Sequence, residues 1–582
     1  MSQEGADFGL VGPSYQAPMA LQNAENCINF YVEMDEGTTP KMPLALLATP
    51  GLNPILSTKT GACRGFWALP GNATALMVTG DTLYLITLTV AATANSIAQF
   101  SVTSIGTLLT NSGPVVIRDN GVVFGGKGGY AVIVDGTYGY YYRIAGAGSI
   151  SFTGGVTNTL TALTLPGALP SGLLIGTGCT LSAASGFIPA NTVISSINYN
   201  TPGITMSAAA TGTNAADTIT LTLPQFGQIT DPGFLGASHI AFIEGWLIFN
   251  QPGTRTFYTT GNVPYTLTFP GSFYALKDSS TDNLVSLYEI NRELWLIGER
   301  TSEVWFNAGN ANFPFSRIPA VGPQIGCAAK YSLARYDSNL IWFCRNEQGE
   351  NTVCMTNQYG WDAVSNHAVE HAFSQYPYTA DAIGYVYQEE GHAFYMLTFP
   401  TADVTWCMDI EARMWHQRLS FDPGTGQYHR HRSNCYSNLQ DLRLVGDYQT
   451  GQIHLMSRNY YTDAGNPIRR QRRSPHVWSR EDRRRVFQSA IQIEFTPGVG
   501  LQVGQGSNPQ AMLRWSNDGG FTWSNEHWTT IGAAGATLNR AKWNRLGRAR
   551  DRVYELNFSD PVACDIIGAT LFGEAEANED AA

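Results

Sequence analysis

The chain has 582 residues and a formal net charge of −11, with 12% aromatic residues and 60 glycines. Only 14% of its residues are charged, against roughly 25% in ordinary soluble domains. A chain of this length can bury a large core and form more than one domain. No apolar run approaches the ~18 residues of a membrane helix, and the first residues lack the basic and apolar regions of a signal peptide. We therefore expect a soluble protein that is made in a cytoplasm and has no membrane anchor.

The charge is divided unevenly along the chain. Residues 461–552 carry 15 Lys and Arg against 7 Asp and Glu, whereas the rest carries 20 against 39. A basic region on an acidic body indicates an electrostatically matched partner or subunit contact. It does not by itself indicate nucleic acid, because an acidic body repels phosphates.

The nine cysteines stand at positions 27, 63, 179, 327, 344, 354, 407, 435 and 564. They are scattered, odd in number and without a Cys-x-x-Cys pair, so the sequence indicates neither a zinc site nor a disulfide framework. We expect buried thiols in strands, with no metal and no cofactor.

Apolar and aromatic runs of four to eight residues, separated by Gly, Asn, Asp and Pro, recur along nearly the whole chain. In residues 75–86 two such runs flank Gly80 and Asp81, a pair that favours a tight hairpin. The paired runs return about every 40–50 residues, the spacing of the four-stranded blades of a β-propeller. The sequence therefore predicts an all-β fold with a propeller of about six blades, seven being the alternative. One short helix is expected at 362–374.

Residues 152–225 interrupt this rhythm. They contain a single charged residue, Asp217, among alternating Thr, Leu and Ile. The alternation predicts a small β-sandwich inserted into a loop of a blade. An extended loop without its own core is the alternative.

These observations divide the chain into six parts. We expect an N-terminal arm with the first strands at 1–60, the first part of the propeller at 61–151 and the inserted sandwich at 152–225. The second part of the propeller follows at 226–460, a basic C-terminal β domain at 461–573 and a flexible acidic tail at 574–582.

Ser516, Asp518, Gly520 and Trp523 have the spacing of an Asp box, a hairpin turn found in propeller glycosidases such as sialidases. The Ser and Asp side chains can hydrogen-bond the backbone of the turn while the Trp packs beneath it. A sialidase also needs several boxes, an arginine cluster, a Tyr nucleophile with a Glu, and an Asp acid. Since there is one box and it follows the predicted propeller, we interpret it as a structural brace and assign no catalytic residue.

Residues 367–371 read His-x-x-Glu-His, the inverted zincin motif, which on a helix would place His367 and His371 one turn apart. An ordinary helix between blades is the preferred interpretation, because the surroundings are rich in strands.

Arginines are concentrated in and around the last predicted strands. They could contact DNA phosphates, pair with carboxylates of a neighbouring subunit or partner, or simply be solvated. No recognised nucleic-acid module accompanies them, so we prefer acidic protein surfaces over DNA. The candidates are Arg469, Arg470, Arg472, Arg473, Arg483, Arg484, Arg485, Arg545, Arg548 and Arg550.

Several short segments are spread along the whole chain: residues 8–15 (FGLVGPSY), 26–33 (NCINFYVE), 49–52 (TPGL), 302–306 (SEVWF), 322–327 (GPQIGC), 446–447 with 451–453, and 461–470 (YTDAGNPIRR). In their order and spread they resemble the packaged-DNA stabilisation proteins of tailed phages.

The resemblance implies a structural virion protein with a β-propeller body and no catalysis, made in the host cytoplasm. It implies a ring of six copies, the tail hub or nozzle, below the portal adaptor ring and attached to the tail needle or to tailspike or fibre proteins. It also implies that the ring retains DNA, which passes through its channel; direct DNA binding stays open. The alternatives are a sialidase-like glycoside hydrolase and a glycan-binding tail protein.

Overall fold

The computed structural model describes residues 5–575, apart from residues 36, 38–41, 93–97, 122–128, 145, 147, 166–178, 199–202, 262–266, 311–312, 320, 347 and 480–483. The regular secondary structure of the described chain is almost entirely β-strand, as the sequence predicts, with one α-helix in these residues, α1 (His367–Ser374). Predicted residues 576–582 of the acidic tail lie outside the described part.

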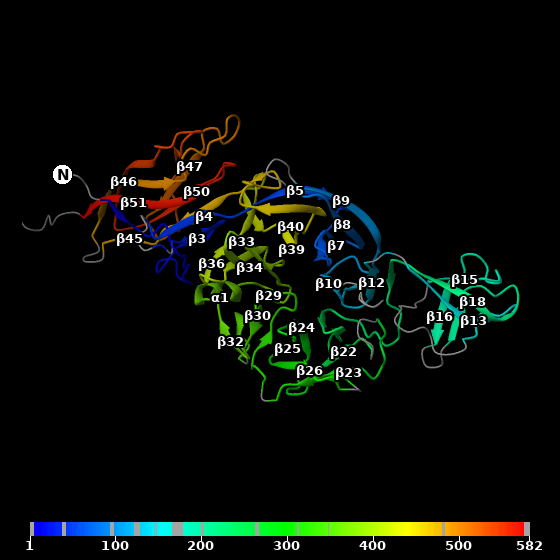
Figure 1. Cartoon of the computed structure of the whole chain (residues 1–582). Coiled ribbons are helices and arrows are strands. Elements are labelled where there is room, and N and C mark those ends of the chain that lie inside the picture. Colours follow the sequence, from blue (N-terminus) through cyan, green and yellow to red (C-terminus); the bar gives the residue numbers. More distant parts are fainter. Residues whose placement is uncertain are drawn as a thin grey trace, which may run out of the picture.

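Seven four-stranded units form the propeller, and Figure 1 shows them following one another around a ring. Blade 1 contains β6 (Cys63–Ala68), β7 (Thr74–Thr79), β8 (Thr82–Val90) and β9 (Gln99–Thr107). Blade 2 contains β10 (Val116–Asp119), β11 (Tyr130–Val134), β12 (Gly139–Arg143) and β19 (Phe226–Gln228). Blade 3 contains β20 (Ile240–Ile243), β21 (Trp246–Asn250), β22 (Thr256–Thr259) and β23 (Tyr274–Leu276).

Blade 4 contains β24 (Leu284–Ile290), β25 (Glu293–Gly298), β26 (Ser302–Asn307) and β27 (Phe315–Arg317). Blade 5 contains β28 (Gly326–Cys327), β30 (Asn339–Arg345), β31 (Asn351–Asn357) and β32 (Gly360–Ala363), with β29 (Ala334–Tyr336) also paired to β30. Blade 6 contains β33 (Ile383–Glu389), β34 (His392–Phe399), β35 (Val404–Asp409) and β36 (Met414–Gln417). Blade 7 contains β39 (Ser433–Leu439), β40 (Leu442–Asp447), β41 (Gln452–Ser457) and the N-terminal β5 (Gly51–Ser57).

The expectation of about six blades is therefore wrong, and the alternative of seven is correct. Two features explain why the spacing of apolar runs along the sequence does not give the number of blades. An insertion separates β12 from β19 within blade 2, and blade 7 takes its outer strand, β5, from the opposite end of the sequence. Contact between β39 and β6 closes the ring.

The local turn chemistry follows the sequence. Gly80 and Asp81 form the two-residue connection between β7 and β8, with Thr79 opposite Thr82, which confirms the predicted hairpin. Gly80 has φ +55°, a conformation that glycine adopts without the steric cost of a side chain. The predicted helix at 362–374 begins later, at His367, because residues 360–363 form β32 and Asn366 caps the helix.

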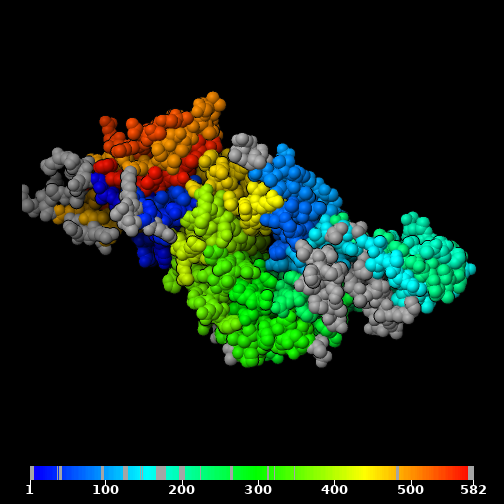
Figure 2. Space-filling view, in the orientation of Figure 1, coloured from blue at the N-terminus to red at the C-terminus, as the bar shows by residue number. Residues whose placement is uncertain are grey.

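The insertion is a small sandwich of two three-stranded sheets. One sheet contains β13 (Gly148–Val156), β18 (Asn214–Leu223) and β15 (Thr180–Ala183), and the other contains β14 (Ala162–Leu163), β17 (Gly203–Met206) and β16 (Ile194–Asn198). Leu181, Ile204 and Leu221 belong to a core of its own, so the extended-loop alternative is wrong. Figures 1 and 2 show that the insertion projects from one side of the propeller, away from the C-terminal domain.

The C-terminal domain is a second sandwich that contains strands from both ends of the chain. Its first sheet contains β3 (Phe30–Met34), β4 (Leu44–Ala48), β51 (Ile566–Ala575), β46 (Val486–Phe495) and β49 (Ala541–Ala549), with β1 (Gly5–Asp7) beside β51. Its second sheet contains β2 (Asn26–Ile28), β44 (Arg470–Arg473), β50 (Asp551–Phe558), β47 (Gln510–Ser516) and β48 (His527–Thr530), with β45 (Val477–Trp478) beside β50. Two short hairpins lie outside these sheets' main strands. One is formed by β37 (Leu419–Asp422) and β38 (Gln427–Arg430). The other is formed by β42 (Thr462–Asp463) and β43 (Asn466–Pro467), and its β42 pairs with β5.

The sandwich and the propeller share one continuous sheet. Strand β36 of blade 6 pairs in parallel with β2, and β2 pairs with β44 of the sandwich. A few residues later in the chain, β3 and β4 enter the first sandwich sheet and β5 enters blade 7. Residues 26–57, which we call the N-terminal tie, therefore belong to both domains.

Asn29 lies at the centre of this junction, 2% exposed and with φ +58°. Its Nδ2 donates to the carbonyl oxygens of Leu419 and Arg469, each at 2.8 Å, and its Oδ1 accepts from the Leu419 N–H at 2.9 Å. Its backbone N–H donates to the Gln417 carbonyl at 2.8 Å. One side chain thus joins the tie to the end of blade 6 and to the start of β44.

A second contact across the junction involves His392 of β34. Its ring bonds Asp409 in its own blade at 2.6 Å and Glu33 of β3 on the other nitrogen. The hydrogen bond with Asp409, helped by Glu33, raises the pKa of His392 to about 9. The imidazolium is therefore charged at neutral pH and links blade 6 to the first sandwich sheet.

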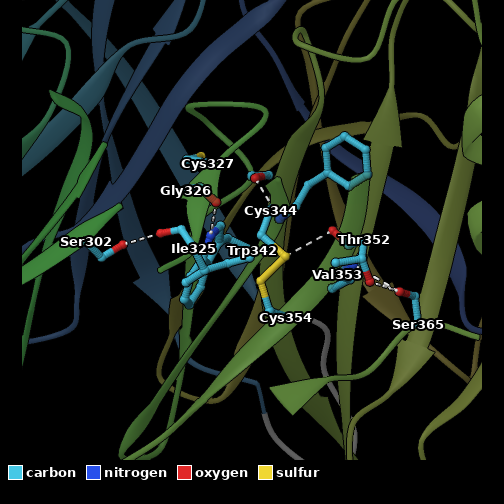
Figure 3. Close-up of a disulfide and its surroundings, with 12 residues drawn as sticks. Ser302, Ile325, Gly326, Cys327, Trp342, Cys344, Thr352, Val353, Cys354 and Ser365 are labelled. Atoms are coloured by element: carbon cyan, nitrogen blue, oxygen red, sulfur yellow. Dashed lines mark hydrogen bonds between the residues drawn. A yellow bond between two sulfur atoms is a disulfide. The ribbon is translucent and has the colours of Figure 1, made fainter. Parts of the chain in front are cut away.

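A disulfide joins Cys344 of β30 to Cys354 of β31, with their Cα atoms 6.1 Å apart (Figure 3). The remaining seven cysteines form no disulfide in the described structure. The expectation of thiols throughout is therefore wrong for this pair, because the hairpin brings two residues ten apart in sequence onto neighbouring strands. Trp342 lies beside the bond, and its Nε1 donates to the Gly326 carbonyl at 3.1 Å.

Replacing Asn29 with Ala should lower the free energy of unfolding by about 3 kcal/mol or more. The change leaves buried backbone groups without hydrogen-bond partners, and Ala tolerates positive φ less well than Asn does. Asn291→Ala is the matched control: it has φ 52° and is exposed in the β24–β25 turn, so a loss of about 1 kcal/mol is expected. Urea unfolding followed by tryptophan fluorescence measures both. Equal losses for the two variants would contradict the role assigned to Asn29.

Peptide mapping without reduction should recover a cross-linked peptide containing Cys344 and Cys354, with the other seven cysteines alkylated after unfolding. Replacing both residues with Ala should destabilise the protein by about 2–3 kcal/mol, since the bond closes a short loop. Cys327→Ala on neighbouring β28 is the control that removes a buried thiol and no cross-link. Alkylation of all nine cysteines in unreduced protein would show that the disulfide does not form.

Candidate docking surface on the C-terminal sandwich

The Asp-box residues form the turn between β47 and β48. Asp518 accepts hydrogen bonds from the Ser516 hydroxyl at 2.6 Å and from the Thr522 backbone N–H at 2.9 Å. Ser516 Oγ accepts from the Gly520 N–H at 2.8 Å, and Trp523 Nε1 donates to the Gly520 carbonyl at 3.0 Å. Hydrogen bonds from Ser516 and Thr522 lower the pKa of Asp518 to about 2. All four predicted residues therefore hold one turn, which is the geometry expected of a brace.

Beneath Trp523 lies a cross-strand ladder of charges. Glu555 of β50 stands directly opposite Arg473 of β44 and Arg514 of β47. Its side chain is fully buried and accepts from Arg473 Nε at 2.6 Å and from Arg514 Nε at 2.7 Å. Both guanidinium groups lie under the Trp523 ring, 5.0 and 4.9 Å from its centroid. The box thus covers an ion-pair network within the chain, which the spacing of the arginines alone does not reveal.

Two of the predicted contact arginines, Arg470 and Arg472, are fully buried. They lie on β44, which runs between β2 and β50 inside the second sheet. Arg472 donates to the Leu10 and Pro13 carbonyls at 2.7 and 3.0 Å. The prediction that these two residues contact a partner is wrong, because both side chains are buried within the chain.

Arg469 and Arg473 are also engaged within the chain. Arg469 lies 3.6 Å from Glu526 and its side chain is 26% exposed, while Arg473 pairs with Glu555 and is 24% exposed. These two residues therefore present only part of their surface to a partner.

The accessible arginines lie in and beside the paired strands β46 and β49. Arg485, Arg545, Arg548 and Arg550 are exposed and Arg484 is half-buried, whereas Arg483 falls outside the described residues. Strand β49 ends the first sheet and also exposes Lys542. We call Arg485, Lys542, Arg545, Arg548 and Arg550 the basic edge. Charged side chains on an edge strand oppose uncontrolled strand pairing and leave the edge open to a partner of opposite charge.

The His-x-x-Glu-His motif is part of the packing of α1. Glu370 accepts from the Thr352 and Ser365 hydroxyls at 2.8 and 2.9 Å, and His367, with its side chain 95% exposed, reaches it at 3.3 Å. Among the described residues no group of three or more His, Cys, Asp or Glu side chains could hold a metal ion. None of the described helical segments is long and apolar enough to cross a membrane.

Two family models match the chain. "Bacteriophage P22 Gp10, beta-propeller" covers residues 191–461, and "Bacteriophage P22 Gp10, beta-sandwich" covers residues 469–574. The chain belongs to the bacteriophage P22 Gp10 family of packaged-DNA stabilisation proteins. This confirms the family suggested by the dispersed sequence segments, and with it a structural phage protein with a propeller and a C-terminal sandwich.

The search of curated sequences finds no match. Similar solved structures include a chain in an S. cerevisiae complex of Dbp5 with Nup159, Gle1, IP6 and ADP, at 7% identity and TM-score 0.34, covering 74% of this chain and 98% of that chain. A KlHsv2 variant with a replaced loop is 7% identical with TM-score 0.24, over 63% of this chain and 96% of its own. The exo-β-1,3-galactanase of Phanerochaete chrysosporium is 9% identical with TM-score 0.19, over 56% and 78%. Likenesses this distant say nothing about function.

Replacing Glu555 with Gln should lower the free energy of unfolding by about 3 kcal/mol, because it leaves two neighbouring guanidinium groups without a compensating charge in a partly desolvated site. Glu526→Gln is the matched control, because it removes the charge that pairs with Arg469. The Glu526 side chain is 31% exposed, so the loss in the free energy of unfolding should be less than about 1 kcal/mol. Equilibrium urea unfolding measures the difference. Equal stability of the Glu555 and Glu526 variants would show that the ion pairs of Glu555 do not stabilise the fold.

Proposed function

We propose that this protein forms the hub or nozzle ring of a phage tail, as six copies below the portal adaptor ring. Membership of the packaged-DNA stabilisation family carries the proposal. In this role the ring helps to retain the packaged DNA and offers its far side to a tail needle, tailspikes or fibres.

The distribution of charge supports subunit contact through the basic edge. The exposed charged side chains of β49, Lys542, Arg545 and Arg548, are all cationic. The chain outside residues 461–552 carries 20 basic against 39 acidic residues. Arginine pairs with carboxylates bidentately and with defined orientation. Complementary charges at a subunit boundary mainly fix register and partner choice. The basic edge would then meet an acidic surface of the next subunit or of the adaptor.

The observation that favoured a glycosidase has a structural explanation. The Asp box lies in the sandwich rather than in a blade, and its carboxylate is occupied by the hydrogen bonds of its own turn. We therefore propose no enzymatic role.

Native mass measurement of the purified protein, alone and mixed with the adaptor protein, tests the proposal. The mixture should give ring-sized assemblies, and Arg545→Glu with Arg550→Glu should weaken assembly about tenfold or more, as expected for loss of charged contacts. Arg292→Glu is the control, since this arginine is 83% exposed on the propeller and lies outside the basic edge. A protein that never joins the adaptor, even at high concentration, would contradict the proposal.

A further inference from the structure

The inner strands of all seven blades enclose a cavity of about 460 Å³ on the propeller axis. Residues in or beside one strand of each blade line it: β6, β10, β20, β24, β29, β33 and β39. The cavity is therefore the central channel of the propeller within one subunit. A volume of this size lies in the range of ordinary small-molecule sites. The cavity is separate from the sandwich, from the basic edge and from the Asp-box turn.

The channel wall is cationic although the whole chain is acidic. Arg64, Arg118, Lys330 and Arg335 line it, and the described lining residues include no Asp or Glu. Arg64 is buried and fully used, since its guanidinium donates to the carbonyls of Gly80, Thr110, Ser112 and Gly113. Arg335 pairs with Glu289 at 3.4 Å. Two cations, Arg118 and Lys330, therefore remain to act on the contents of the channel.

Arg118 and Lys330 are held by aromatic rings rather than by carboxylates. The Arg118 guanidinium lies 4.1 Å from the Trp67 ring centroid and 5.0 Å from that of Tyr288. The Lys330 ammonium lies 4.8 Å from the Tyr331 centroid. Among the described residues neither side chain has a carboxylate oxygen within 4 Å. Burial raises the pKa of the Glu289 carboxyl, and the charge of Arg118 acts on that pKa in the opposite direction. Cation–π contacts fix the position of a cation without neutralising it, so both charges stay available to an anion.

His239 lies in the same wall as the two cations. Its ring stacks on Tyr331 at 5.2 Å, and its two nitrogens bond Ser238 Oγ and the Lys330 carbonyl. Burial, with further contributions from Lys330 and Arg118, lowers the pKa of His239 to about 3. The ring is neutral at pH 7, and the two flanking cations supply the positive charge.

A flat aromatic surface also lines the channel. Tyr385 of β33 and Tyr436 of β39 are both half-buried and stack with centroids 5.5 Å apart and planes 9° apart. The Tyr385 hydroxyl is bonded to Ser433 Oγ at 2.6 Å, which fixes the orientation of the ring. The faces and edges of such rings suit a planar or sugar ring.

We propose that the propeller channel binds a small organic phosphate, with its phosphate between Arg118 and Lys330 and its ring system against the tyrosine wall. The charge decides the class of ligand. A phosphate monoester carries about −1.5 to −2 at pH 7, which two cations match, whereas a single carboxylate would leave one of them uncompensated. Arginine provides the planar fork and lysine the point charge.

Isothermal titration of the purified full chain tests the proposal, with AMP, adenosine and inorganic phosphate as probes. AMP should bind, inorganic phosphate should bind more weakly, and adenosine should bind least. Arg118→Gln and Lys330→Gln should each weaken AMP binding about tenfold or more. The Lys330 side chain makes one ring contact, to Tyr331, and its hydrogen bond with His239 uses the backbone carbonyl, which Lys330→Gln keeps. This variant therefore tests the site even where Arg118→Gln affects folding.

Arg317→Gln is the matched control, because this exposed arginine pairs with Asp278 outside the channel and should leave AMP binding within about twofold. Failure of AMP to bind the unsubstituted protein would overturn the proposal, and so would equal affinity in all variants. Binding of inorganic phosphate without AMP would overturn the assignment to an organic ligand. The measurement needs no ring or adaptor, so its result is independent of the role in the tail.

Discussion

The N-terminal tie is the constraint on which the rest of the structure depends. In about thirty residues the chain bridges blade 6 to the sandwich through β2, builds two strands of the first sandwich sheet, and closes the propeller through β5. Buried hydrogen bonds of Asn29 and the charged His392 bridge fix these segments to one another. Propeller and sandwich are therefore joined by backbone pairing and buried polar contacts rather than by a linker, and Figure 1 shows the tie at their boundary.

This arrangement determines which arginines face the solvent. Strand β44 lies between β2 and β50, Arg470 and Arg472 on it are buried, and Arg473 pairs with Glu555. The basic character that reaches the surface lies instead on the free edge of the first sheet. The same sequence feature, a dense run of arginines, thus serves two physical purposes: internal pairing near β44 and a charged edge at β49.

Much of the architecture could be predicted from the sequence. Hairpin chemistry at Gly80, the alternating uncharged insertion and the basic final strands all give local signals, and the structure follows them. The seventh blade could not be counted, because its closing strand lies about 400 residues before the strand with which it pairs. Pro54 within β5 was a usable signal, since proline in a strand indicates an edge or a bulge, and the pairing with β41 shifts register there.

The candidate site was harder to predict than the fold. The Asp-box spacing identified the turn, but nothing in sequence order shows that Trp523 covers Arg473, Arg514 and the distant Glu555. The same holds for the propeller channel, because Arg118 of blade 2 and Lys330, which precedes β29 of blade 5, line one cavity only when the blades close into a ring.

The central claim is that propeller and sandwich form one rigid building block of a phage tail. An electron cryo-microscopy map of the assembled particle's tail tests it most directly. The account predicts repeated density below the portal into which the tied propeller and sandwich fit together as a single body. A tail map without such density, or one that accepts the two domains only after they are separated, would contradict it.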